Sequence, residues 1–186
     1  TIGCPFTCSF CSIAAVYQRH WSSKSPERIV REIRYFVKNH GTDTVELDGT
    51  NFFANPRWAK EVLKALAASG MKINYVSATR ADLIMRWDDE MKELIRKVGF
   101  RSMGVGAESG SERVLELLDK KLKVDEIVES LKVLKELDIE PAYTFMFGLP
   151  GETLEDSLMT LDLMAKLKEE MPECRTPGLF YHPFPG

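Results

Sequence analysis

The chain has 186 residues, of which 44% are hydrophobic and 28% charged, an ordinary composition for one globular domain with a core of its own. The formal net charge of −3 does not favour a nucleic-acid partner, and no apolar run reaches the roughly 20 residues that span a bilayer. The four cysteines, three of them clustered, do not form a disulfide framework and indicate a reducing compartment. We therefore expect a cytoplasmic protein with no membrane partner.

Helices and strands are predicted to alternate along the chain. The first long helix has a serine cap and a proline in Ser25-Pro26 and a glycine stop at Gly41, and the last is capped by Thr153. From such caps and the 3.6-residue apolar period, we predict helices over 25–40, 55–70, 88–98, from 111, over 124–137 and over 153–171. We predict strands over 44–48, 73–77, 101–107, 141–147 and 179–182, with one more just before Cys4.

This alternation predicts an α/β fold, because crossovers of this length make neighbouring strands parallel. We expect a partial (β/α)6 TIM-like barrel. The cysteine cluster begins at the fourth residue and leaves no room for a strand to present it, and the chain stops just after a short apolar run. Residues 1–186 are therefore expected to be one core domain of a longer protein, truncated at both ends.

In parallel βα barrels, chemistry collects in the loops after the carboxyl ends of the strands. Polar segments, three of them with glycine, follow four of the predicted strands here. They are Asp48-Gly49-Thr50-Asn51, Ser77-Ala78-Thr79-Arg80, Glu108-Ser109-Gly110 and Gly148-Leu149-Pro150-Gly151.

The most informative motif is the run CxxxCxxC formed by Cys4, Cys8 and Cys11. Structural zinc and ferredoxin-type clusters take four protein ligands, and no fourth cysteine lies close by in the sequence. Three thiolates suit a cubane 4Fe–4S cluster with one iron open to a non-protein ligand. A zinc site that borrows a distant ligand, and a cysteine-rich loop without metal, are the alternatives. Cys174 is expected to be a bystander.

The cysteine run, with the aromatic Phe10 before its last cysteine, resembles the signature of the radical S-adenosylmethionine (radical SAM) enzymes. The resemblance implies that Cys4, Cys8 and Cys11 hold a 4Fe–4S cluster whose open iron chelates the methionine part of S-adenosylmethionine. An electron from the cluster would then cleave the cofactor to a 5′-deoxyadenosyl radical, with Phe10 at the adenine. It also implies an external one-electron reductant of the flavodoxin or ferredoxin type and a small-molecule or peptide substrate.

Two further motifs resemble cofactor-binding segments of this family. In the run Gly106-Ala107-Glu108-Ser109-Gly110-Ser111, Glu108 and Ser109 would contact the methionine and ribose; a turn that caps the next helix is the alternative. Gly148 begins the Gly-Leu-Pro-Gly segment whose backbone would meet the adenine, although such a segment alone is merely a turn.

The loop after the first predicted strand departs from the family's usual Gly-Gly-Glu. It resembles instead a variant of the cobalamin-binding branch, and backbone carbonyls at Gly49 and Thr50 could receive the methionine ammonium; the alternative is a simple turn. Arg80 could pair with a carboxylate of the cofactor or substrate, or form a surface ion pair with Asp82. His182 is more simply read as an ordinary strand-end histidine than as part of the barrel mouth.

The resemblance is closest to the branch whose full-length members carry a cobalamin-binding domain, which includes methyltransferases and ring-forming enzymes of tetrapyrrole biosynthesis. It implies hydrogen abstraction or radical-assisted methyl transfer, with cobalamin as a further cofactor of the full-length protein. The competing hypothesis is a non-catalytic iron–sulfur or zinc-binding module. The polar Glu108-Ser109 pair after a strand favours the enzyme, because an electron carrier needs no ribose site.

Overall fold

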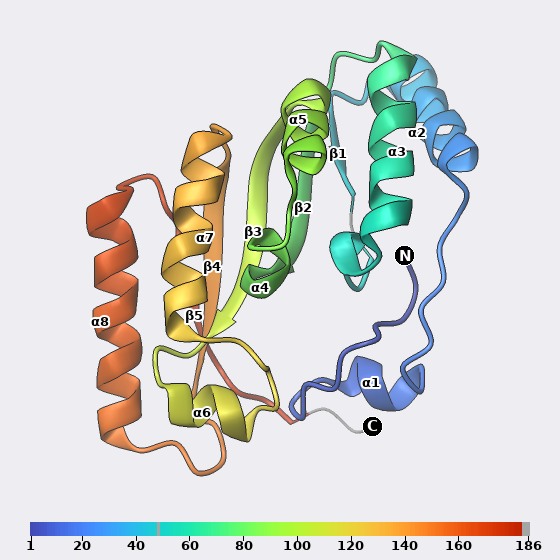
Figure 1. The fold of residues 1–186 in the computed structure, drawn as a ribbon. Helices are drawn as coiled ribbons and strands as arrows, with labels where there is room; N and C mark the ends of the chain where they lie inside the picture. The colour runs from blue at the N-terminus through green and yellow to red at the C-terminus, as the bar shows by residue number, and fades with distance from the viewer. Residues whose placement is uncertain (48, 184–186) are drawn as a thin grey trace.

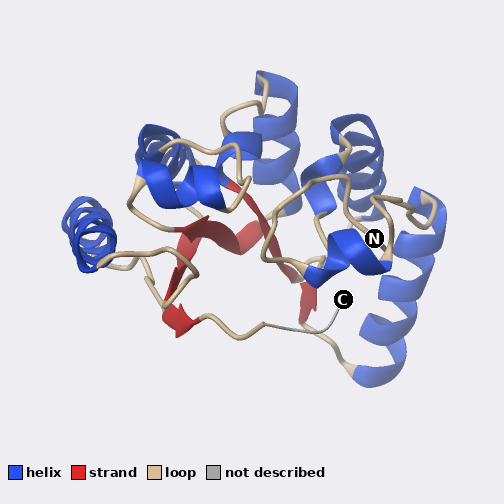
Figure 2. Ribbon diagram, turned by 90° about the horizontal axis from the view of Figure 1, so that it is seen from below, coloured by secondary structure: helices blue, strands red, loops and turns tan. Residues whose placement is uncertain are grey.

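The computed structural model describes residues 1–47 and 49–183. Its centre is one sheet of parallel strands in the order β1-β2-β3-β4-β5. The strands are β1 (Thr44–Glu46), β2 (Asn74–Arg80), β3 (Phe100–Glu108), β4 (Glu140–Phe147) and β5 (Gly178–Phe180). Figure 2 shows that the sheet is curved and open, with the long helices around its outside. The expected partial barrel is therefore confirmed.

The helices connect successive strands, as the alternation predicted (Figure 1). The longer ones are α2 (Pro26–His40), α3 (Pro56–Ser69), α5 (Asp89–Val98), α7 (Val124–Glu136) and α8 (Leu154–Glu170). The shorter ones are α1 (Ser12–Val16), η1 (Phe52–Ala54), α4 (Ala81–Ile84) and α6 (Glu112–Leu117).

The predicted caps explain where the long helices begin and end. The Ser25 hydroxyl accepts a hydrogen bond from the Arg28 backbone N–H at 3.3 Å, and Gly41 ends α2 with a left-handed φ of 64°. At the other end of the chain, Thr153 and Asp156 form a reciprocal capping box at the start of α8. These local interactions satisfy backbone groups that the helix itself leaves unpaired.

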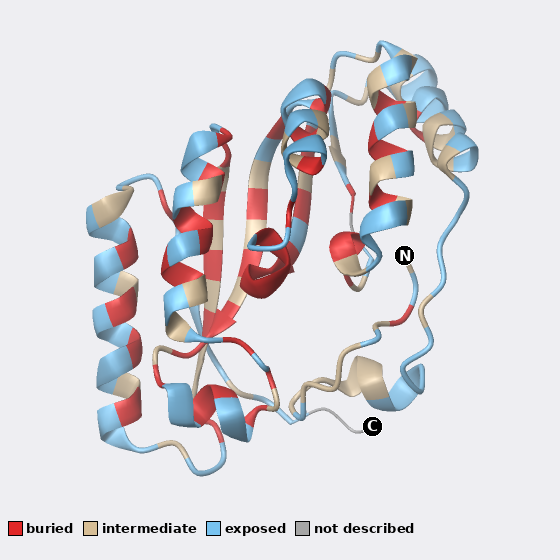
Figure 3. Cartoon of the chain, viewed as in Figure 1, coloured by how far each residue is buried: buried red, intermediate tan, exposed pale blue. Residues whose placement is uncertain are grey.

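The hydrophobic core lies between the sheet and the helices, whose buried faces turn toward the strands (Figure 3). Leu63 of α3, Ile95 of α5 and Leu131 of α7 are at most 1% exposed, and burial of each such side chain contributes about 1.5–3 kcal/mol. Met103 and Tyr143 meet them from β3 and β4 and are fully buried. The core thus fixes the strands whose carboxyl ends carry the predicted site.

Several boundaries differ from the sequence prediction. Strand β2 continues to Arg80, because its last residues pair with β3, and β5 ends at Phe180, so His182 lies beyond it. Helices α1 and α4 were not predicted. In place of a strand before Cys4, the described residues show one isolated antiparallel bridge between Ile2 and Ser22. None of the helices in residues 1–47 and 49–183 is long and apolar enough to cross a membrane.

Candidate active site

The candidate site lies at the carboxyl edge of the sheet. Strand β2 ends at Arg80 and β3 at Glu108, and Gly148 directly follows β4 with a φ of 74°. Thr50 belongs to the loop after β1. Asp48 of the same predicted loop lies outside the described residues.

The cysteine loop is fastened to this edge at several points. The Ser9 backbone N–H donates to the Leu118 carbonyl at 2.9 Å, just after α6, and the Thr7 hydroxyl donates to the Asp119 carboxylate. On the other side, the Thr50 hydroxyl donates to the carbonyl of Gly3. The loop is therefore held from two different parts of the sheet edge.

Cys4, Cys8 and Cys11 are reduced and half-buried, and they line one cavity of about 130 Å³. The same cavity is lined by Phe6, Phe10, Ala14, Thr50, Asn51, Arg80 and Lys120. Burial raises the pKa of the Cys4 thiol, and the Phe6 backbone hydrogen bond opposes this shift. Within residues 1–47 and 49–183, no three cysteine, histidine or acidic side chains are grouped so as to hold a single metal ion.

This donor set fits an iron–sulfur cluster. Three thiols surround one cavity, and the charged ends of Arg80 and Lys120 lie near its wall. Cationic groups offset the negative charge that thiolates and sulfides bring to such a cluster. The loop residues that would hold the cluster are thus in place together with compensating charge.

Arg80 is nearly buried and all three of its guanidinium nitrogens have partners. Nε donates to Asp82 at 2.7 Å, Nη1 donates to the Cys8 sulfur at 3.2 Å, and Nη2 donates to the Lys120 carbonyl. The guanidinium carbon lies 4.3 Å from the centre of the Phe6 ring. The ion pair with Asp82 that was the alternative is therefore present, but its side chains are only 8% and 3% exposed, so the pair is buried and does not lie at the surface.

Glu108 adopts an unusual backbone conformation for a residue with a side chain. Its φ is +67°, and the Ser109 backbone N–H donates to the Ala107 carbonyl at 2.9 Å, which makes a tight turn at the end of β3. A left-handed non-glycine residue costs about 1–3 kcal/mol and tends to occur at functional sites. The surrounding structure therefore stabilises this conformation at the strand end.

The Glu108 carboxylate accepts a hydrogen bond from the Lys120 ammonium at 2.5 Å, in a pair whose side chains are 10% and 5% exposed. Gly106 makes room for this pair: a Cβ at that position would lie 2.6 Å from Glu108 Oε1 and 3.0 Å from Lys120 Nζ. The Lys120 ammonium lies 5.6 Å from the centre of the Phe10 ring. Glu108 is thus linked to the cysteine cavity through Lys120.

The remaining predicted residues do not line the cysteine cavity. Ser109 is fully buried, its hydroxyl shares a hydrogen bond with Thr160 of α8 at 3.1 Å, and it accepts from the Ser111 backbone. Gly49 packs against Thr1, and Gly148 lies beside Phe180. The structure therefore brings Phe10, Thr50, Arg80 and the three cysteines together, and leaves Gly49, Glu108, Ser109 and Gly148 outside the lining of that cavity.

Four residues that line the cavity were not among the predicted site residues: Phe6, Ala14, Asn51 and Lys120. Phe6 lies inside the cysteine motif, so its aromatic side chain was an available signal. Lys120 carries no such signal, because its role depends on how the segment after α6 packs against β3.

Known proteins identify the family. The family model of the Radical SAM superfamily matches residues 1–164 of this chain. The chain belongs to the radical SAM superfamily. Among solved structures, the chain is similar to the radical S-adenosylmethionine methyltransferase TsrM from Kitasatospora setae, with cobalamin and a 4Fe–4S cluster bound. The TM-score is 0.80 at 18% identity, over 96% of this chain and 34% of that one.

Curated relatives of this radical SAM chain have been named as methyltransferases and cyclases. It is 25% identical to an uncharacterized methyltransferase of Pyrococcus horikoshii, over 89% of this chain and 35% of the relative. It is 32% identical to the anaerobic magnesium-protoporphyrin IX monomethyl ester cyclase of Cereibacter sphaeroides, over 82% of this chain and 25% of the relative. The chain therefore spans about a quarter to a third of the length of these relatives.

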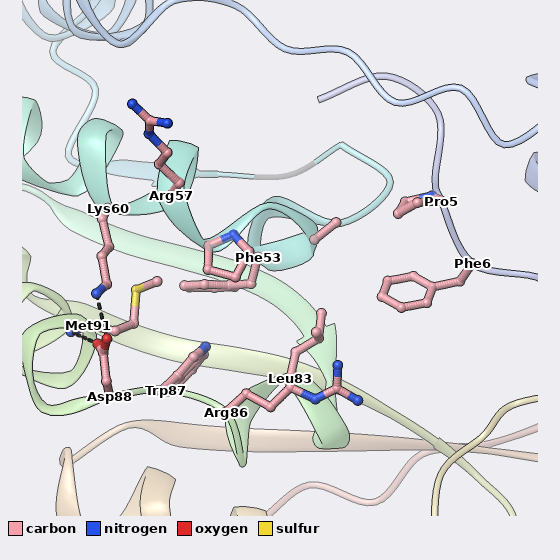
Figure 4. Close-up of a pocket in the computed structure, with 12 residues that line it drawn as sticks. Pro5, Phe6, Phe53, Arg57, Lys60, Leu83, Arg86, Trp87, Asp88 and Met91 are labelled. Carbon is pink, nitrogen blue, oxygen red and sulfur yellow. Dashed lines mark hydrogen bonds and ion pairs between the residues drawn. The ribbon is translucent and has the colours of Figure 1, made fainter.

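A second and larger pocket adjoins the cysteine loop of this radical SAM chain. Figure 4 shows Phe6 at one end of it and Phe53 and Trp87 further in, with the Lys60 ammonium hydrogen-bonded to Asp88 at 2.6 Å. The pocket measures about 480 Å³. Phe6 lines both this pocket and the cysteine cavity, so the two hollows adjoin at this residue.

Proposed function

We propose that residues 1–186 are the catalytic core domain of a radical SAM enzyme that binds a 4Fe–4S cluster and S-adenosylmethionine. The single observation that carries this proposal is the cavity lined by Cys4, Cys8 and Cys11 at the carboxyl edge of a parallel sheet. When bound, the cluster and cofactor supply a 5′-deoxyadenosyl radical for hydrogen abstraction or radical-assisted methyl transfer. Cys4, Cys8 and Cys11 would hold the cluster and would leave it one position open to the cofactor.

The other residues of this edge orient the cofactor. Phe10 borders the adenine, and the backbone of Gly148 meets the same base. Glu108 accepts hydrogen bonds from the methionine ammonium or a ribose hydroxyl. Its contact with Lys120 supports this role, because it shows that the carboxylate already accepts a bond from an ammonium at this position.

Four predicted residues contribute in other ways. Carbonyls of Gly49 and Thr50 offer a second acceptor for the methionine ammonium, since Thr50 lines the cavity. The hydroxyl of Ser109 fixes the turn after β3 through its bond to Thr160, so we assign its contribution to the ribose site to its backbone. Arg80 faces Cys8 and is close enough to the cavity to reach a cofactor carboxylate.

The relatives suggest what the whole protein does. TsrM and OxsB have been solved with cobalamin, and other relatives are a hopanoid C-3 methylase and the cyclase described above. We therefore propose that the full-length protein uses cobalamin as a further cofactor and acts on a small-molecule or peptide substrate. An external one-electron reductant of the flavodoxin or ferredoxin type would serve it, in the reducing cytoplasm.

The competing proposal is a non-catalytic iron–sulfur or zinc-binding module that keeps the cysteine loop and ignores the cofactor. The strained turn at Glu108 and the buried Glu108–Lys120 pair favour the enzyme. An electron carrier has no use for a buried, cation-accepting carboxylate beside its cluster, and such a pair costs desolvation energy.

Anaerobic reconstitution tests the proposal. The chain should take up about four irons and four sulfides, and S-adenosylmethionine should change the electron paramagnetic resonance spectrum of the reduced cluster. Cys8→Ala should lose the cluster, whereas the matched control Cys174→Ala should keep it, because Cys174 is buried in the core far along the chain. Stoichiometric zinc without sulfide, or a cluster whose spectrum ignores the cofactor, would favour the non-catalytic module.

A further inference from the structure

We propose that Arg80 is a positioning residue that raises the reduction potential of the cluster through a charged hydrogen bond to the Cys8 thiolate. This inference rests on the proposed function, because it presumes a cluster on Cys4, Cys8 and Cys11. It goes beyond that function by assigning a redox role to a residue of β2.

The guanidinium of Arg80 is pre-aligned for this role. Asp82 holds Nε at 2.7 Å and the Lys120 carbonyl holds Nη2, which leaves Nη1 directed at the Cys8 sulfur at 3.2 Å. A planar guanidinium fixed at two of its nitrogens loses little further freedom when the third donates. The contact to Cys8 is therefore set by the fold.

The guanidinium that makes this contact is buried. Arg80 is 7% exposed, and the Phe6 ring covers its guanidinium at 4.3 Å. Where water is excluded, a charged hydrogen bond is electrostatically stronger than in solvent. Phe6 lines both the cysteine cavity and the pocket of Figure 4, so its ring covers the guanidinium where the two hollows adjoin.

The contact is also asymmetric among the cysteines. Of the three cavity sulfurs in the described residues, Cys8 is the one that accepts a hydrogen bond from a side chain. Hydrogen bonds to cluster sulfurs and nearby charge are two of the factors that set iron–sulfur potentials.

The sign follows from charge. Reduction adds one electron to the site and neither makes nor breaks a covalent bond, so the reduced form carries one more negative charge. A fixed cation that donates to a ligand sulfur stabilises that form more than the oxidised one. Arg80 should therefore make the cluster easier to reduce.

A redox titration with dithionite as the electron donor, followed by electron paramagnetic resonance, tests this role on the reconstituted protein. Arg80→Gln should lower the ratio of reduced to oxidised cluster at a fixed potential about tenfold, which is a downward shift of about 59 mV for a one-electron couple. Arg80→Lys keeps the charge but loses the planar fork, so its reduction potential should lie between those of the wild type and Arg80→Gln. Asp82 keeps a cationic partner in both variants, because Nη2 of Arg86 lies 3.3 Å from its carboxylate.

Arg86→Gln is the matched control. It removes the same charge from the same aspartate partner, but its side chain is 67% exposed and it makes no contact with a cysteine, so the potential should not move. An unchanged potential in Arg80→Gln would overturn the proposal, and so would equal shifts in Arg80→Gln and Arg86→Gln. Folded Arg80 variants that both fail to assemble a cluster would also overturn it, in favour of a role in assembly. A wild-type chain that takes up no cluster would refute the proposed function itself.

Discussion

The buried Glu108–Lys120 pair makes the sharpest prediction about stability. Lys120→Met removes the ammonium and leaves the Glu108 carboxylate in a site where its side chain is only 10% exposed. Glu108→Gln removes the opposite charge at almost constant volume. Since each single change already leaves one buried charge without its partner, the second change should add nothing to the cost of the first.

The magnitude follows from the distance and the burial. At an effective dielectric constant of about 20, unit charges about 4 Å apart attract by about 4 kcal/mol, and desolvation offsets part of this. We expect each single substitution to lower the free energy of unfolding by about 3 kcal/mol. The double variant should lose no more than either single one, which gives a coupling energy of about 3 kcal/mol.

Urea denaturation of the metal-free chain under reducing conditions measures the four free energies of the cycle. Glu129→Gln is the control, because Glu129 pairs with Lys132 at a similar 2.6 Å but with side chains about half exposed. That substitution should leave the free energy of unfolding unchanged within error. A coupling energy below about 0.5 kcal/mol for Glu108 and Lys120, the lower limit for residues in contact, would refute the reasoning.

Three further predictions concern single residues. Burial raises the pKa of the Cys174 thiol to about 11. Iodoacetamide at about pH 8 should therefore alkylate the other three thiols of the folded chain and spare Cys174 until urea is added. Labelling of Cys174 before urea is added, detected by mass spectrometry, would contradict this. The Arg113 guanidinium, with hydroxyls of Ser111 and Thr153, holds the pKa of Asp156 well below its ordinary 3.8, so this carboxylate stabilises the fold at neutral pH and loses that contribution as the pH falls below the ordinary value. The free energy of unfolding should therefore fall less between neutral and acid pH in Asp156→Asn than in the wild type. An equal dependence of that free energy on pH in the two proteins would count against this role. Glu108→Gln should weaken S-adenosylmethionine binding by about 1.5–3 kcal/mol with the cluster retained; unchanged affinity by calorimetry would reduce Glu108 to a structural role.

Much of the fold could be predicted from local signals. Ser25 and Asn55 cap their helices as expected, and Gly41 and Gly70 end them in the left-handed conformation, because these residue types satisfy helix ends by interactions only a few positions apart. The short helices α1 and α4 could not be predicted. Their stability depends on tertiary contacts, since helices this short are not stable alone.

The residues of the candidate site also fall into those that the sequence predicts and those that it does not. The spacing of Cys4, Cys8 and Cys11 is a local property of the sequence, so their shared cavity could be anticipated. Lys120 could not, because its contact with Glu108 depends on the fold around Gly106. The direction of the Ser109 hydroxyl toward α8 was equally hidden, since the partner Thr160 lies 51 positions away in the sequence.

The most direct test of the central claim is to ask whether the reduced protein cleaves S-adenosylmethionine. After anaerobic reconstitution and reduction with dithionite, chromatography with mass spectrometry should find 5′-deoxyadenosine and an equal amount of methionine. Cys8→Ala treated in the same way should form neither. Absence of 5′-deoxyadenosine from a wild-type protein with a complete, reduced cluster would contradict the assignment of this chain as a catalytic radical SAM core.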